Sequence, residues 1–169
     1  MIKRRKFQDN QYLCTMSNWK QTLLQEAHKK GMCGDYLKPL TLCADKITAI
    51  ELCMKEPRWA LSHDLPTISE LRKWFSLYEV EGLYVDRKFS GESLTDHNCY
   101  ILHSCNGEIA TGLNIDKAII PDIHISNGSH LKIKSVGPAV RIDIFVYGDD
   151  NVVETEGDSK FIVHRHDKN

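Results

Sequence analysis

The residues best suited to chemistry are two His-x-Cys pairs in the second half of the chain, His97 with Cys99 and His103 with Cys105. In a β-strand the two members of each pair point to one face, about 6.8 Å apart, which suits zinc chelation. The outermost two would lie roughly 27 Å apart in one extended strand, so a shared ion requires a sharp bend. The pattern allows zinc as a cofactor and a Cys–His nucleophile as a second hypothesis. The ordinary alternative is a buried Cys and a surface His.

A second histidine pair, His164 with His166, lies near the end of the sequence. If strands stack, this pair is suited to share a metal ion with His124 or His130. A solvated terminus is the simpler interpretation. We therefore assign no metal, cofactor-binding or catalytic residue from these patterns, and keep the two His-x-Cys pairs as the metal candidates.

Charge and motifs narrow the function classes. The chain has 22 basic and 23 acidic residues, so its net charge gives no general argument for binding nucleic acid or acidic membranes. The single basic run, Lys3-Arg4-Arg5-Lys6, favours a solvated arm and leaves a nucleic-acid-associated regulator as an alternative. The sequence contains no GxGxxG, GxxxxGK[ST], GxSxG or HExxH motif. An enzyme, which would be metal-dependent, is therefore a further alternative rather than the main expectation.

The six cysteines and the hydrophobic patterning indicate a compartment. None of the cysteines forms a CxxC pair, and the opening residues MIKRRKFQDN lack the apolar stretch of a secretory signal. No apolar run approaches the roughly 18 residues that a membrane-spanning helix needs. We therefore expect reduced thiols and a cytoplasmic location.

Composition changes abruptly near Glu79. Residues 1–79 contain eleven Leu and no Val, whereas residues 80–169 contain only five Leu and are rich in Ile and Val. β-branched residues favour strands and Leu favours helices. The order of helices followed by strands predicts an α+β fold, in which residues 1–16 form an arm, 17–79 a helical cap and 80–169 a β domain.

Periodicity and capping residues predict the helices. Ser17 is suited to cap a helix that ends at Gly31, and helical spacing continues from Cys43 to Met54. Thr67 and Glu70 form a capping box for a third helix. We expect three residues of the last helical segments to join the helices to the first strands: Trp59, Leu71 and Phe75.

Short β-rich segments separated by Gly, Asn and Asp turns fill the second half. The expected strands are 83–86, 99–104, 108–115, 117–125, 131–136, 140–147, 151–155 and 160–166. Alternation from Val140 to Val146 predicts that one face is buried. Asn106-Gly107 favours a hairpin, and hence an antiparallel β-sandwich, whereas the recurrent small turns suit a β-solenoid equally well.

Residues 57–86, PRWALSHDLPTISELRKWF…EGLYVD, favour the solenoid through a resemblance. They resemble a family from gut Bacteroidales genomes and their phages that carries W-x-[LM]-x-x-x-[FLY]-P-x-x-x-x-L-R-x-x-F, then Gly-[LVI]-Tyr, then a β-solenoid. The matching positions are Trp59, Leu61, Pro66, Leu71, Arg72, Phe75, Gly82 and Tyr84. The resemblance implies a helical cap on a short C-terminal β-solenoid and a phage or mobile-element setting, but no activity.

The expected function is therefore a non-enzymatic binding or scaffold protein, with a protein partner or a second copy as its ligand. A solenoid capped at one end has another end, formed here by the segment 160–166. That end is too apolar for a well-protected terminus. Its interface candidates are Phe161, Ile162, Val163, His164 and His166.

Overall fold

The computed structural model describes residues 18–75, except for the side chain of Phe75, and residues 80–168. The expected arm over residues 1–16, with its basic run and the cap residue Ser17, lies outside the described residues, as does the Phe75 side chain. The chain divides after Leu52 into two compact units. Each unit is described by itself.

The first unit is helical, as its Leu-rich composition predicts. It contains α2 (Asn18–Lys29) and α3 (Gly34–Leu42), and α4 (Lys46–Met54) begins within it. Helix α2 buries Leu23 and Ala27, which are four residues apart and therefore on one face. Asp45 caps α4, because its Oδ1 accepts a hydrogen bond of 2.8 Å from the backbone N–H of Thr48.

The second unit opens with two short helices, α5 (Pro57–Ser62) and α6 (Ile68–Phe75). The capping box is confirmed: Thr67 N–H donates to Glu70 Oε2 at 2.9 Å, and Glu70 N–H donates to Thr67 Oγ1 at 3.2 Å. Leu71 is buried as expected. Trp59 is half-buried and stacks on the ring of His63.

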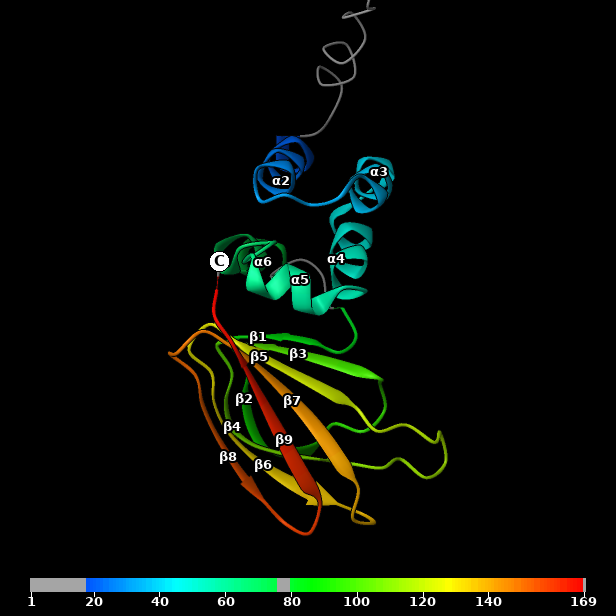
Figure 1. The fold of residues 1–169 in the computed structure, drawn as a ribbon, viewed down its shortest axis with the longest axis vertical. Coiled ribbons are helices and arrows are strands. Elements are labelled where there is room, and N and C mark those ends of the chain that lie inside the picture. The colour runs from blue at the N-terminus through cyan, green and yellow to red at the C-terminus, as the bar shows by residue number, and fades with distance from the viewer. Residues whose placement is uncertain (1–17, 76–79, 169) are drawn as a thin grey trace, which may run out of the picture. The chain divides into compact units, whose positions relative to one another are not determined.

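Nine strands follow and form two parallel sheets (Figure 1). The five-stranded sheet has the order β1-β3-β5-β7-β9 and the four-stranded sheet the order β2-β4-β6-β8, so successive strands alternate between the sheets. This is a parallel β-solenoid of about four turns, as expected, and the antiparallel sandwich is excluded. The strands are β1 (Leu83–Val85), β2 (Lys88–Ser93), β3 (Cys99–His103), β4 (Asn106–Gly112), β5 (Asp122–Ser126), β6 (His130–Val136), β7 (Arg141–Tyr147), β8 (Val152–Glu156) and β9 (Lys160–His166).

Turns of one geometry connect the two sheets. The residue after each of the first four strands of the five-stranded sheet has a positive φ, in the left-handed region that Asn, Asp and Gly tolerate best. These residues are Asp86, Ser104, Asn127 and Gly148. The turn that the sequence assigned to a hairpin, Asn106-Gly107, instead begins β4 and pairs in parallel with Lys88 and Phe89 of β2.

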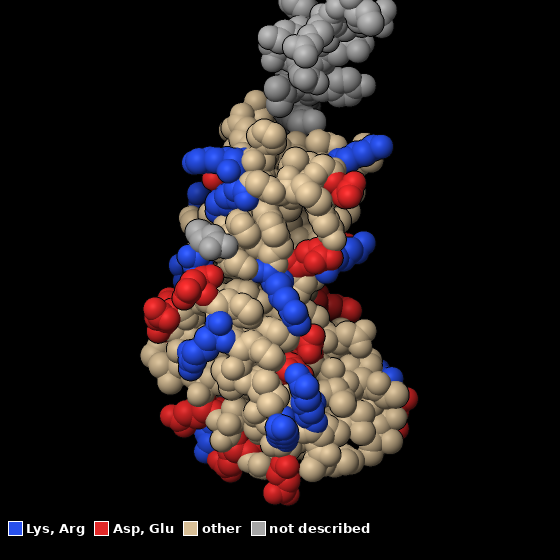
Figure 2. Space-filling view, in the orientation of Figure 1, with Lys and Arg blue, Asp and Glu red and all other residues tan. Residues whose placement is uncertain are grey.

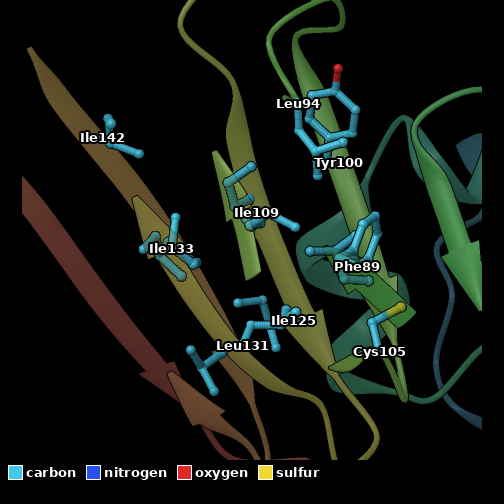
Figure 3. Close-up of a cluster of buried hydrophobic side chains, with 13 residues drawn as sticks. Phe89, Leu94, Tyr100, Cys105, Ile109, Ile125, Leu131, Ile133 and Ile142 are labelled. Carbon is cyan, nitrogen blue, oxygen red and sulfur yellow. The ribbon is translucent and has the colours of Figure 1, made fainter. Parts of the chain in front are cut away.

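The interior of the solenoid is a column of aliphatic side chains, several of which are labelled in Figure 3. Ile123, Ile125, Ile133, Ile142 and Ile144 have no measurable exposure. Rings occupy the first coil, where Tyr84 and Phe89 meet edge to face with centroids 5.4 Å apart. Burial of this apolar surface is the main stabilising contribution to the second unit.

Helices α5 and α6 cover the face of the five-stranded sheet that is turned away from the four-stranded sheet (Figure 1). Arg58 of α5 lies 4.3 Å from the ring centroid of Phe145 in β7, and Arg72 of α6 bonds Asp86 after β1 at 2.7 Å. The alternation in β7 correctly predicted a buried inner face. The outer face is also buried at Phe145 and Tyr147, because the helices form a third layer.

Candidate functional site

The terminal coil, which we define as β8, β9 and the turn at residues 157–159, carries the candidate interface residues. Within the described residues, β9 pairs only with β7 and β8 pairs only with β6, so both strands present a free edge (Figure 1). Val152 of β8 is 47% exposed and Val163 of β9 is 40% exposed. Unpaired backbone groups beside exposed apolar side chains form a template for another strand.

The structure places all five interface candidates on β9. Phe161 and Ile162 are half-buried, and Phe161 packs against the interior core. His164 is half-buried and His166 is exposed. The companion strand β8 was not predicted as part of this end, although its Val152-Val153 pair follows an acidic turn and is apolar like the run in β9.

The two edge strands carry opposite charge. β9, with the sequence KFIVHRH, contains Lys160 and Arg165 and no acidic residue. β8, with the sequence VVETE, contains Glu154 and Glu156 and no basic residue. Elsewhere, on the face that Figure 2 shows, acidic and basic side chains are interspersed. The terminal coil is therefore a divided surface with one basic and one acidic edge.

The end of the chain does not cover this edge as far as Lys168. Lys168 Nζ donates a hydrogen bond to Asn127 Oδ1, in the turn between β5 and β6. Its side chain also passes beside Gly148, in the turn between β7 and β8. The tail therefore runs back along earlier coils and leaves the edges of β8 and β9 free of it.

A stack of rings runs along the outer face of the five-stranded sheet toward the terminal coil. Parallel strands place His124, Phe145 and His164 at one register position. Phe145 stacks on both histidine rings with centroids 4.7 Å apart. In the adjacent column Tyr147 stacks on His166 at 5.1 Å. This arrangement stiffens β9 against β7 and so holds the free edge in place.

The two buried residues of this stack, His124 and Tyr147, are uncharged and contribute to packing rather than to proton transfer. His124 Nδ1 lies 3.0 Å from the hydroxyl oxygen of Tyr147. Burial lowers the pKa of His124 to about 3, assisted by the charges of Arg58 and His166. Burial also raises the pKa of Tyr147. Both groups are therefore neutral at physiological pH, and the hydrogen bond joins two uncharged partners.

Asp143 fixes the outer side of β9. Its carboxylate accepts bonds from Arg141 at 2.7 Å and 2.9 Å, and its Oδ1 lies 2.7 Å from His164 Nε2. The bond from Arg141 and then the bond from His164 lower the pKa of Asp143 to about 2. The carboxylate is therefore charged at physiological pH and acts as a structural anchor for His164.

The four metal candidates lie in separate environments. His97 packs edge to face on Tyr100, and its Nδ1 lies 4.0 Å from Glu81. Cys99 lies on the outer face of β3, whereas Cys105 belongs to the interior core. The positive φ of Ser104 ends the strand alternation between them. His103 Nδ1 lies 2.8 Å from the Asn127 amide nitrogen.

Burial favours the uncharged form of three of these residues, Cys99, His103 and Cys105. Burial raises the pKa of both thiols, Cys99 and Cys105, to about 11, so they are protonated at neutral pH. Burial lowers the pKa of His103 to about 3. No group of three or more His, Cys, Asp or Glu side chains within the described residues is placed to hold a metal ion.

The histidines of the second metal hypothesis, in which His164 and His166 share an ion with His124 or His130, do not form one cluster either. His164 and His166 lie on the outer face of the five-stranded sheet, and His124 stacks with Phe145 beneath them. His130 belongs to the other sheet, where it pairs with Asn106 and Val152. Three of these histidines, His124, His164 and His166, therefore belong to the ring stack and do not form a set of metal ligands.

Comparison with known proteins does not assign this chain to a family. No family model, no curated protein and no solved structure matches this chain. Among the described helices, none is both long and apolar enough to cross a membrane.

Proposed function

We propose that this chain is a non-enzymatic binding or scaffold protein whose terminal coil is its binding surface. One observation carries the proposal: in the part of the chain that the structure describes, β8 and β9 each expose an unpaired strand edge and an apolar side chain, Val152 and Val163. A free edge offers main-chain hydrogen bonds to an extended partner, and the neighbouring side chains supply specificity.

The chemistry of the candidate catalytic groups supports binding over catalysis. A thiol with a pKa of about 11, as in Cys99 and Cys105, is a poor nucleophile at neutral pH. The histidines nearest these thiols in the sequence do not form a Cys–His pair with them, because His103 bonds Asn127 and His97 packs on Tyr100.

The setting that we propose is the cytoplasm of a cell that carries a phage or another mobile element. The resemblance of residues 57–86 supports the mobile element. The free thiols of Cys33, Cys99 and Cys105 support a reducing compartment.

Site-specific photo-crosslinking tests the binding surface. The full chain carries a photoreactive phenylalanine at Val163, or as a matched control at Lys88 on the first coil, in cells that naturally express it. We expect a crosslinked protein from position 163, either another protein or a second copy, and none from position 88. The proposal is overturned if position 163 yields no crosslink or no more than position 88.

A further inference from the structure

We infer that the occupant of the terminal coil is a second copy of this chain, arranged so that β8 of each copy pairs with β9 of the other. This inference rests on the proposed function and names its partner. It follows from the directions of the two edge strands, their charges and their apolar side chains.

Strand direction allows one symmetric contact to complete both sheets. β8 and β9 follow each other around the coil through a short turn, so they run in opposite directions in opposite sheets. A two-fold axis parallel to the strands and lying between the two coil ends would place β9 of the second copy against β8 of the first, antiparallel. The same operation places β8 against β9, so all four free edges are paired.

The turn between the strands fixes which residues meet. Because residues 157–159 connect β8 to β9, Glu156 and Lys160 lie at the same level along the strands. The two-fold axis preserves that level. It therefore places Glu156 of one copy opposite Lys160 of the other, with Val152 opposite His164.

On the outer face of the four-stranded sheet, acidic and basic side chains alternate from strand to strand up to the free edge of β8. Outward-facing Glu108 of β4 is followed by Lys132 and Lys134 of β6, and these by Glu154 and Glu156 of β8. Lys134 Nζ lies 3.0 Å from Glu108, and Lys132 forms an ion pair with Glu156. The next member of this outward-facing series would be a basic side chain, and Lys160 in β9 of the second copy supplies one. Cross-strand pairs of opposite charge stabilise a sheet.

The apolar side chains agree with the same arrangement. Val163 continues the interior column of Ile123 and Ile144, and Val153 lies beside Leu131 in the other sheet. In the paired coil ends, these inner-facing side chains of β9 and β8 come together over the open end of the core. The contact removes from water the exposed part of Val163 and the half-buried Phe161.

Charge opposes the other symmetric arrangement. A two-fold axis perpendicular to the sheets would pair β9 with β9 and β8 with β8. That contact brings two basic β9 strands together at one edge and two acidic β8 strands together at the other. The mutual repulsion of like charges disfavours it relative to the contact that joins a basic strand to an acidic one.

A charge exchange between copies tests the arrangement. Sedimentation equilibrium of the full chain measures the dimer dissociation constant for the natural protein, for Glu156→Lys and for Lys160→Glu. We expect a dimer at tens of micromolar, weakened about tenfold or more by either substitution, since each homodimer then sets like charges together twice. An equimolar mixture of the two variants regains the dimer, because both contacts of the mixed pair join a lysine to a glutamate.

Controls separate the contact from folding. Regained association in the mixture shows that both variants are folded, and Glu154→Lys, diagonal to Lys160, serves if Glu156→Lys does not fold. Asp116→Lys and Lys55→Glu make the same charge changes at exposed positions outside the terminal coil and leave the dissociation constant unchanged.

Three outcomes overturn the inference. A natural chain that stays monomeric at 200 micromolar (about tenfold above the expected range) rules out the second copy, while a crosslink from position 163 to another protein would leave the proposed function standing. Variants that dimerise like the natural chain exclude the pairing of β8 with β9. A Lys160→Glu chain that dimerises more tightly alone, with no gain on mixing, indicates pairing of β9 with β9.

Discussion

Individual histidines on the outer face of the sheet show how burial decides chemistry. His103 and His124 are 4% and 1% exposed, and each is held by a hydrogen bond to a neutral group, the Asn127 amide or the Tyr147 hydroxyl. A protonated imidazole in either place would lose its hydration, and the carboxylate of Asp86 near His103 offsets only a small part of that loss. Two residues of a type that often performs catalysis therefore act as neutral packing groups, and His124 also stacks on Phe145.

These two histidines predict an acid-sensitive fold. Their pKa values are about 3 in the folded chain and near 6.5 when unfolded, so between those values the unfolded chain binds protons that the folded chain does not. The free energy of unfolding is therefore unaffected by them above pH 6.5. It falls below that pH by about 1.4 kcal/mol per pH unit for each histidine.

Urea unfolding at a series of pH values, from about 7.5 (above the window that the two pKa values define) to about 4.5 (inside it), measures this slope. His124→Phe keeps a ring to stack on Phe145 and removes one titrating group, so we expect its slope to be smaller by about one proton. A slope equal to that of the natural chain would show that His124 is protonated in the folded state.

At the scale of elements, the sequence predicted that the first half is helical and the second half is β-structure, and it predicted most of the strands. The shift from Leu to Ile and Val correctly predicted helices before strands, and the expected strand 160–166 coincides with β9. β2 was missed because only Phe89 of its six residues is buried, so it shows no alternation. The expected strand 117–125 was too long: β5 begins at Asp122, and the preceding residues form a loop in which Ile120 is 42% exposed.

The coil repeat and most of the site were hidden for physical reasons. Leu83, Ile101, His124, Phe145 and His164 occupy one register position, but their numbers are unevenly spaced because loops of different length separate the strands. The sequence did point to β9 through its apolar run. It held no sign that Arg58 contacts Phe145, since a contact between distant elements leaves no local pattern.

Close stacking of β4 on β2 predicts a specific sensitivity at Gly107. This residue has a φ of +110°, and a Cβ there would overlap the carbonyl oxygen of Phe89. Gly91 also has a positive φ, of +103°, but the nearest atom to its Cβ would be 3.8 Å away, on Glu108. The two glycines share the conformational cost of an alanine and differ in space.

We expect Gly107→Ala to lower the free energy of unfolding by at least about 2 kcal/mol more than Gly91→Ala. Chemical denaturation of both variants, followed by far-ultraviolet circular dichroism, gives the comparison. Equal losses would mean that β2 and β4 can separate at little cost and that the first coil is looser than the structure shows.

For the molecule as a whole, the division after Leu52 places α2 and α3 in the first unit and places α5, α6 and every strand in the second. The interior core lies entirely in the second unit. So do α5 and α6, whose Arg58 and Arg72 hold the outer face of the five-stranded sheet. Without that layer, the outer face would present Ile101, His124, Phe145 and Tyr147 to water.

Two truncations test this organisation. We expect a fragment of residues 53–169 to unfold cooperatively in urea with strand-rich circular dichroism, because it retains all three layers. A fragment of residues 80–169 keeps every strand but exposes Phe145 and its neighbours. We expect it to bind a hydrophobic dye and to aggregate or to unfold at a distinctly lower urea concentration. If the two fragments are equally stable, α5 and α6 contribute nothing to the solenoid and the outer face is stable when exposed. If the longer fragment fails to fold, the first unit contributes to the core of the second.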